Sequence, residues 1–173
     1  MKENQNLFRD LQEDFRKMKK NLLVAQSGGP TAAINATLAG VIKQAIKEEQ
    51  IDQVYGACYG IQGVLEQKFV NLTEKVDTEE KLEKLKRTPA AALGSCRFKL
   101  NDIKEDDSQY QEIVDILHKM NIGYFVYIGG NDSMDTVGKM SRYVKEHQMD
   151  VKVIGIPKTI DNDIWGTDMT FGF

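Results

Sequence analysis

The chain has little of several features that mark specialised classes of protein. It contains two cysteines, three prolines and one tryptophan. Cys58 and Cys96 lack the spacing of metal ligands, so we interpret them as reduced thiols of a cytoplasmic protein. No apolar run reaches membrane-spanning length, and the polar N-terminus does not resemble a signal peptide. A net charge of −3 gives no basic field for nucleic acid. We therefore expect neither a membrane nor a nucleic acid as a partner.

What is present fits a globular domain with a sizeable core, since 41% of the residues are hydrophobic and 28% are charged. Short apolar runs alternate with segments whose apolar residues have helical spacing. The predicted strands are 22–25, 54–58, 124–128 and 151–156, and we expect all of them except 54–58 to be buried. The predicted helices are 34–46, 73–87 with Thr73 or Thr78 as cap, 108–121, and one that begins near Val137. This order predicts an α/β fold, a doubly wound and mostly parallel sheet flanked by helices.

Residues 1–20 form a predicted N-terminal extension, and residues 21–173 the domain itself. In the extension, apolar residues recur at the spacing of an amphipathic helix. They are Leu7, Phe8, Leu11, Phe15 and Met18.

The first predicted strand runs into Gly28-Gly29, and a helix follows. Glycine lets backbone amides approach a phosphate closely, and the start of the helix adds free N–H groups. Neither the P-loop spacing nor the dinucleotide-binding spacing is present. A tight turn without a ligand is the alternative interpretation.

A second glycine turn, Gly129-Gly130, follows the strand 124–128 and continues into oxygen-bearing side chains. Asn131, Asp132 and Ser133 could cradle phosphate together with a hard cation. We expect Mg²⁺ rather than Ca²⁺, because the segment supplies few ligands and would depend on substrate phosphates.

Two further segments carry polar chemistry. Arg97 follows Gly94-Ser95, and its planar fork suits phosphate oxygens, although a surface arginine is the simpler alternative. Lys158, Thr159 and Asp161–Asp163 follow the strand 151–156 and could position a hydroxyl, accept its proton and hold a cation; an Asx-rich turn is the alternative. Carboxyl ends of parallel strands meet at one edge of the sheet, so we expect all these segments to converge there.

In their order and spacing these blocks resemble the N-terminal part of a phosphofructokinase, from about residue 21 onward. The matching blocks are Ser27-Gly28-Gly29 with Asn35, Leu93 to Phe98, Gly129 to Ser133, and Gly155 to Asp163 followed by Gly166-Thr167-Asp168. The Thr-Ile-Asp-Asn-Asp block is highly specific for the family.

The resemblance implies phosphorylation of fructose 6-phosphate on its 1-hydroxyl, with Mg²⁺ as cofactor. Asp161 matches the catalytic base, Thr159 a substrate contact, and Asp163 the carboxylate that supports the base and the metal. Arg97 matches the residue that bridges the donor and product phosphates. The resemblance also implies that the phosphoryl donor is bound by Arg97 together with Gly28, Gly29, Gly130, Asp132 and Ser133.

Asp132 and Lys158 resemble the pyrophosphate-dependent branch of the family, because ATP-using members carry glycine at both positions. A carboxylate at Asp132 would repel the α-phosphate of a nucleotide, and Lys158 could neutralise charge on the breaking pyrophosphate. We count both among the catalytic residues. An ATP-dependent enzyme is the alternative. NAD kinases and lipid kinases share a similar turn but lack the Pro-Lys-Thr-Ile-Asp-Asn-Asp block.

Asn131 stands where the family usually has an aspartate that helps to hold Mg²⁺, so we expect water and pyrophosphate to supply most metal ligands, with Asn131 and Asp163 as the protein ligands. The resemblance implies a subunit that runs well beyond Phe173 and a full-length protein that is a homo-oligomer. We therefore expect the chain by itself to be the donor-binding half and inactive or nearly so. A non-catalytic phosphate-binding fragment is the alternative.

Limited proteolysis tests the predicted extension. We expect brief trypsin digestion to remove residues 1–17 before it cuts within 21–173, because the apolar stripe of the extension has no place in the predicted core. Mass spectrometry of the early fragments gives the readout. Protection of residues 1–17 equal to that of the domain would contradict the boundary.

Overall fold

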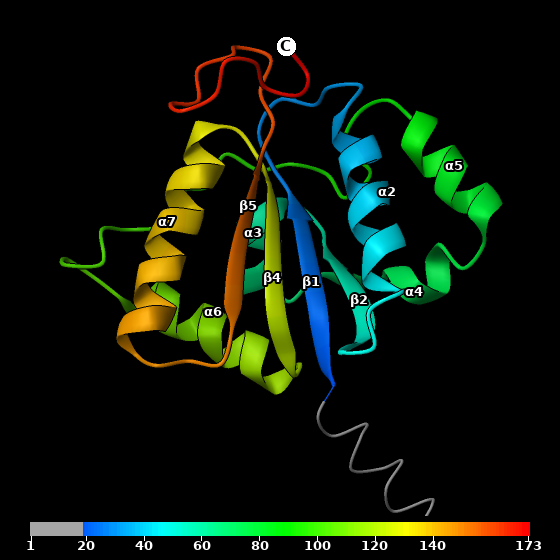
Figure 1. Cartoon of the computed structure of the whole chain (residues 1–173). Coiled ribbons are helices and arrows are strands. Elements are labelled where there is room, and N and C mark those ends of the chain that lie inside the picture. The colour runs from blue at the N-terminus through cyan, green and yellow to red at the C-terminus, as the bar shows by residue number, and fades with distance from the viewer. Residues whose placement is uncertain (1–18) are drawn as a thin grey trace, which may run out of the picture.

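The structure, a computed structural model, describes residues 19–173 (Figure 1). A five-stranded sheet lies between two layers of helices. The predicted N-terminal helix and all but the last two residues of the predicted extension lie outside the described residues.

The sheet has the order β3-β2-β1-β4-β5. Strands β1, β2, β4 and β5 are parallel, and β3 pairs with β2 in the antiparallel direction. The strands are β1 (Lys20–Gln26), β2 (Ile51–Ala57), β3 (Phe69–Asn71), β4 (Ile122–Gly129) and β5 (Lys152–Pro157). The helices are α2 (Ile34–Ala45), α3 (Gly60–Leu65), α4 (Leu72–Lys75), α5 (Glu79–Arg87), α6 (Ser108–Lys119) and α7 (Asn131–Glu146). The predicted doubly wound, mostly parallel fold is confirmed.

The central strands supply both hydrophobic cores, because successive side chains of a strand point to opposite faces. In β1, Leu23 and Ala25 pack with α3, α6 and α7, whereas Leu22 and Val24 pack with α2 and α5. Both faces of β1 are therefore buried, which explains its continuous apolar run.

The segment 73–87 does not form the single helix that we predicted. Helix α4 ends at Lys75, and α5 begins after Thr78, whose side chain accepts a hydrogen bond from the Lys81 amide at 3.3 Å. The cap at Thr78 is thus confirmed, and it marks a new helix start rather than a point within one helix. Thr73 is not a cap, because Asn71 caps α4.

Strand β5 is parallel as predicted, but the prediction that it is buried was wrong. It lies at the edge of the described sheet, and the Ile154 side chain is 46% exposed. An apolar run alone does not reveal which strand of a parallel sheet will be outermost. The short elements β3 and α3 were not predicted; α3 begins at Gly60 and has only six residues.

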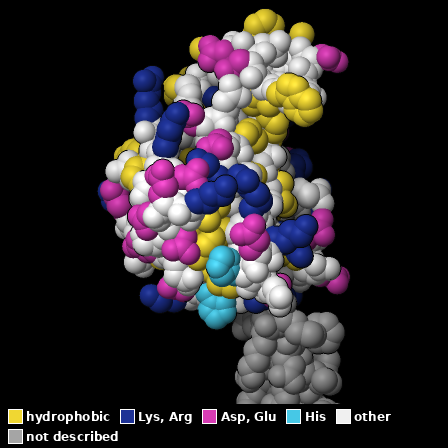
Figure 2. Space-filling model, turned by 90° about the vertical axis from the view of Figure 1, so that its left-hand side faces the viewer, with side chains coloured by type: hydrophobic (Ala, Val, Ile, Leu, Met, Phe, Trp, Pro, Cys, Tyr) yellow, Lys and Arg dark blue, Asp and Glu magenta, His cyan; other side chains and the backbone are white. Residues whose placement is uncertain are grey.

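Large apolar side chains are exposed along the segment that follows β5. Figure 2 shows apolar surface at the top of the molecule, where this segment lies. Its exposed apolar residues are Ile160, Trp165, Met169, Phe171 and Phe173. Among the described residues, no helix is long and apolar enough to cross a membrane.

A buried pair of amide side chains joins β1, α2 and the segment that leads to Arg97. Gln26 donates to the Asn35 carboxamide oxygen at 3.0 Å and accepts from the Leu93 amide at 2.9 Å. Asn35 also accepts from the Ala92 amide at 2.9 Å and donates to the Thr88 carbonyl at 2.9 Å. Gln26 and Asn35 are fully buried, so water does not compete for the hydrogen bond between their side chains or for the one from the Leu93 amide.

Removal of the Asn35 side chain should destabilise the domain strongly. Asn35→Ala removes one of the two acceptors of the buried Gln26 amide group, which keeps only the Ile34 carbonyl at 3.2 Å, and it also removes the acceptor of the Ala92 N–H. We therefore expect a loss of about 2–4 kcal/mol in the free energy of unfolding. Urea denaturation measures it. The control is Gln44→Ala on the exposed face of the same helix, where we expect a change within about 0.5 kcal/mol. Equal losses for the two variants would contradict the proposed importance of the buried pair.

Candidate active site

A cavity of about 770 Å³ opens at the carboxyl edge of the parallel strands. Every residue to which we assigned a catalytic, substrate-binding, donor-binding or metal-binding role lines it, although β1, β4, β5 and the 95–99 segment are far apart in the chain. These residues are Gly28, Gly29, Arg97, Gly130, Asn131, Asp132, Ser133, Lys158, Thr159, Asp161 and Asp163. The predicted convergence on one edge is therefore observed; the role of each residue stays a prediction.

Two side-chain hydrogen bonds hold the Arg97 segment against the first glycine turn. The Ser95 hydroxyl donates to the Gly28 carbonyl at 2.7 Å, and the Ser27 hydroxyl donates to the Cys96 carbonyl at 3.0 Å. Gly28 has φ +78°, a left-handed conformation that disfavours a side chain. Arg97 is exposed on the cavity and forms no ion pair with another described residue. Its guanidinium is thus free to meet an anion.

The second glycine turn leads directly into a helix. We predicted a loop through Thr136, but α7 already begins at Asn131, so Asn131, Asp132 and Ser133 occupy its first turn. A side chain on Gly129 would overlap the Ser133 hydroxyl, so this position needs glycine. The free N–H groups of a 16-residue helix therefore face the cavity, an arrangement that favours anions.

Lys158 is almost completely buried, with 1% of its surface exposed. Its ammonium group donates to the Gly29 carbonyl, and its backbone N–H donates to the Gly129 carbonyl at 2.8 Å. Burial lowers the pKa of Lys158, and the nearby Asp161 carboxylate partly opposes that shift by raising it. The side chain thus links the ends of β1 and β5 and places its ammonium group in the wall of the cavity.

Thr159 organises the two carboxylates that follow it. Its hydroxyl lies 3.5 Å from Asp161 Oδ2 and 3.3 Å from Asp163 Oδ1, and it accepts the Asp161 amide at 3.1 Å. Thr159 is buried, whereas both carboxylates are exposed on the cavity. The arrangement presents two negative charges side by side on a fixed support.

The donor atoms fit a hard cation in part. Asp161 and Asp163 supply oxygens, but Asn131 contacts Asp163 Oδ2 through its amide nitrogen, at 2.5 Å. Asn131 would have to turn its amide to present oxygen to a metal. Across residues 19–173 no group of three acidic, histidine or cysteine side chains is arranged to hold a metal ion. A cation here would therefore take most ligands from water and phosphate, as expected for Mg²⁺.

Asn162, which we grouped with the two carboxylates as a possible contact to a ligand, does not line the cavity and instead holds the loop in place. It has φ +50°, accepts the Thr170 amide at 2.8 Å and donates to the Asp168 carbonyl at 3.1 Å. Asparagine tolerates the left-handed conformation better than most residues. These contacts close the segment 162–170 into a loop and fix the backbone on either side of Asp161 and Asp163. The Asp-Asn-Asp sequence of this segment was the signal from which the turn at Asn162 could be predicted.

The comparisons with known proteins agree with the motifs. The phosphofructokinase family matches residues 21–173. A pyrophosphate–fructose 6-phosphate 1-phosphotransferase from Rhodospirillum rubrum is 43% identical over 90% of this chain and 37% of its own length. An ATP-dependent 6-phosphofructokinase from Bacteroides thetaiotaomicron is 35% identical over 87% of this chain and 42% of its own length. The crystal structure of a pyrophosphate-dependent phosphofructokinase from Nitrosospira multiformis superimposes with a TM-score of 0.81 at 37% identity, over 89% of this chain and 37% of that one. The chain thus spans well under half the length of these relatives.

Asn162 provides a test of the loop geometry that needs no ligand. In Asn162→Ala we expect hydrogen exchange of the Thr170 amide to accelerate by about tenfold or more, because its acceptor is lost and alanine disfavours the left-handed conformation. Asn162→Asp keeps an acceptor oxygen and should retain most of the protection. The Ser27 amide, which donates to the Ile128 carbonyl, is the internal control. Unchanged Thr170 exchange in Asn162→Ala would contradict the assigned contact.

Proposed function

Because this chain belongs to the phosphofructokinase family, we propose that it is the donor-binding and catalytic part of a pyrophosphate-dependent enzyme. The reaction moves a phosphoryl group from pyrophosphate to the 1-hydroxyl of fructose 6-phosphate and yields fructose 1,6-bisphosphate and phosphate. The observation that carries the proposal is that a carboxylate pair, two glycine turns, a helix N-terminus and an exposed arginine line one cavity.

Asp161 is the general base in this proposal. It is exposed on the cavity, and its backbone amide is fixed by the buried Thr159 hydroxyl. A carboxylate so placed can accept the proton of the sugar hydroxyl while oxygen attacks phosphorus. Asp163 shares the Thr159 contact and stabilises the arrangement. Thr159 also faces the cavity and is the proposed contact to the substrate.

The donor lies on the opposite side of the cavity. Gly28, Gly29 and Gly130 allow the backbone to approach the phosphates, and Ser133 lies in the first turn of α7. Arg97 adds a fork that can bridge two phosphate groups. Phosphoryl transfer depends mainly on positioning and charge stabilisation, and this set of groups supplies both.

Lys158 and Asp132 are the residues on which the choice of donor depends. Lys158 places its charge at the first glycine turn, while its backbone contacts the second turn, so the bridging oxygen of pyrophosphate would leave close to this charge. Asp132 projects at the mouth of the cavity, where a nucleotide would place its α-phosphate; the carboxylate would repel it. The sequence similarity to pyrophosphate-dependent relatives supports this assignment.

Mg²⁺ is the proposed cofactor, with Asp163 and Asn131 as its protein ligands and with charge neutralisation on the transferring phosphate as its contribution. We further propose that the complete protein is a cytoplasmic homo-oligomer, as the family resemblance implies.

ATP is the second candidate donor, since an ATP-dependent relative matches at 35% identity. A coupled assay of fructose 6-phosphate turnover with Mg-pyrophosphate or Mg-ATP separates the two. It is run on this chain and on a version extended past Phe173, because the relatives are more than twice as long. We expect turnover with pyrophosphate in the extended version and little in the chain alone. Turnover with ATP only would overturn the assignment.

Two substitutions sharpen the test in whichever version turns over. Asp161→Asn should lower kcat by on the order of 10²-fold or more with little change in KM, since it removes the base and keeps the shape. Asp132→Gly should raise the use of ATP relative to pyrophosphate. Lys158→Gly is less informative, because loss of a buried side chain also opens a cavity and removes the link to Gly29. An unchanged kcat in Asp161→Asn would refute the role of the base.

A further inference from the structure

We propose that Lys99 is a further pyrophosphate-binding residue and that its ion pair with Asp132 opens when the donor binds. The inference rests on the proposed function, since it extends the donor side of the same cavity. Nothing in the sequence motifs singled out Lys99, and it emerges from the geometry alone.

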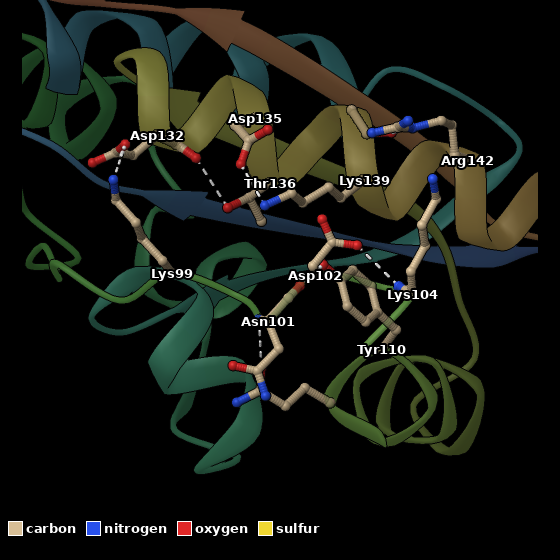
Figure 3. Close-up of polar contacts among 12 residues, drawn as sticks. Lys99, Asn101, Asp102, Lys104, Tyr110, Asp132, Asp135, Thr136, Lys139 and Arg142 are labelled. Atoms are coloured by element: carbon tan, nitrogen blue, oxygen red, sulfur yellow. Dashed lines mark hydrogen bonds and ion pairs between the residues drawn. The ribbon is translucent and has the colours of Figure 1, made fainter. Parts of the chain in front are cut away.

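Lys99 lies two residues after Arg97 on the segment that lines the cavity. Its ammonium group reaches Asp132 in the first turn of α7, with Nζ 2.9 Å from Oδ1 (Figure 3). The next acidic residue of the helix, Asp135, pairs instead with Lys139 on the same helix, at 2.8 Å. The Lys99–Asp132 pair is thus a link between two separate cavity walls.

The Lys99–Asp132 ion pair is exposed and can open when another anion competes for Lys99. The Lys99 and Asp132 side chains are 72% and 70% exposed, so water competes for both charges. Exposed ion pairs contribute little to stability, whereas hydrogen bonds from a cation to phosphate oxygens are among the stronger ones. A multiply charged anion in the cavity can therefore take Lys99 from Asp132 at small cost.

Besides Lys99, two cationic side chains line the cavity, and they do not balance the negative charge that the cavity would hold with pyrophosphate bound. Lys158 is buried and already donates to the Gly29 carbonyl, and burial lowers its pKa. Arg97 is exposed and carries one positive charge. Pyrophosphate carries several negative charges, and Asp132, Asp161 and Asp163 add more to the same cavity. Lys99 reduces that imbalance when it turns from Asp132 to the donor.

The exchange also explains how Asp132 can discriminate between donors. While Lys99 holds it, the Asp132 carboxylate is neutralised. Once Lys99 binds pyrophosphate, the carboxylate is released at the mouth of the cavity, where it repels any further phosphate. A nucleotide, which continues into an α-phosphate, meets that charge, and pyrophosphate does not.

A double-mutant cycle on pyrophosphate binding tests the proposal. Isothermal titration with Mg-pyrophosphate compares the chain with Lys99→Met, Asp132→Asn and the double variant. We expect Lys99→Met to weaken binding by about tenfold in both backgrounds, because a charged hydrogen bond to the ligand is lost in each. Lys99→Arg should restore most of the affinity. Lys104→Met, on the same loop but outside the cavity, is the control and should bind as the unmodified chain does.

Three results would overturn the inference. If Lys99→Met weakens binding only while Asp132 is present, Lys99 acts by neutralising the Asp132 carboxylate and does not contact the donor. If Lys99→Met binds normally, Lys99 has no part in the site. If the unmodified chain does not bind pyrophosphate, the inference and the donor assignment both fail. Binding that depends on Lys99, without turnover in the extended version, would instead count against the proposed function alone. Circular dichroism confirms that each variant is folded.

Discussion

The buried contact between Gln26 and Asn35 is the interaction on which the rest of the site depends. It joins the end of β1, the start of α2 and the backbone at Ala92 and Leu93 in one network, whose two amide side chains are fully buried. The 95–99 segment is part of no helix or strand, so the sheet cannot position it directly. The amide network and the hydroxyls of Ser27 and Ser95 do so instead. Arg97 and Lys99 reach the cavity because these polar groups hold their backbone.

The cavity therefore combines groups that hydrogen bonds hold in place with charged side chains that are exposed to solvent. Its frame is made of backbone at strand ends, a buried lysine and the Thr159 and Asn162 contacts, all of which are fixed by hydrogen bonds. The charged groups of Arg97, Asp132 and Asp161 stand on that frame and are exposed. This division suits phosphoryl transfer, in which positioning must be retained while charge is redistributed between donor and acceptor.

Much of this arrangement could be predicted from the sequence, because it follows local rules. Glycine pairs after apolar runs predicted the turns, and parallel strands required those turns to share an edge. Register and layer order could not be predicted, since they depend on contacts between distant segments. The edge position of β5 depends on the neighbours of the strand and not on its own apolar composition. The start of α7 at Asn131 was missed because its first turn is polar, as helix starts that face an anion site often are.

The pairing of side chains was the feature hardest to anticipate. Asp132 by sequence is a repulsive charge near the donor, but in the structure it is paired with a lysine that no motif included. Asn131 by sequence is a metal ligand, but it contacts Asp163 through nitrogen. Both contacts join residues more than 30 positions apart. In each case a residue at the cavity contacts a neighbour that, under the proposed function, pyrophosphate or Mg²⁺ would have to displace. On that proposal, donor and metal binding depend as much on the contacts that open as on those that form.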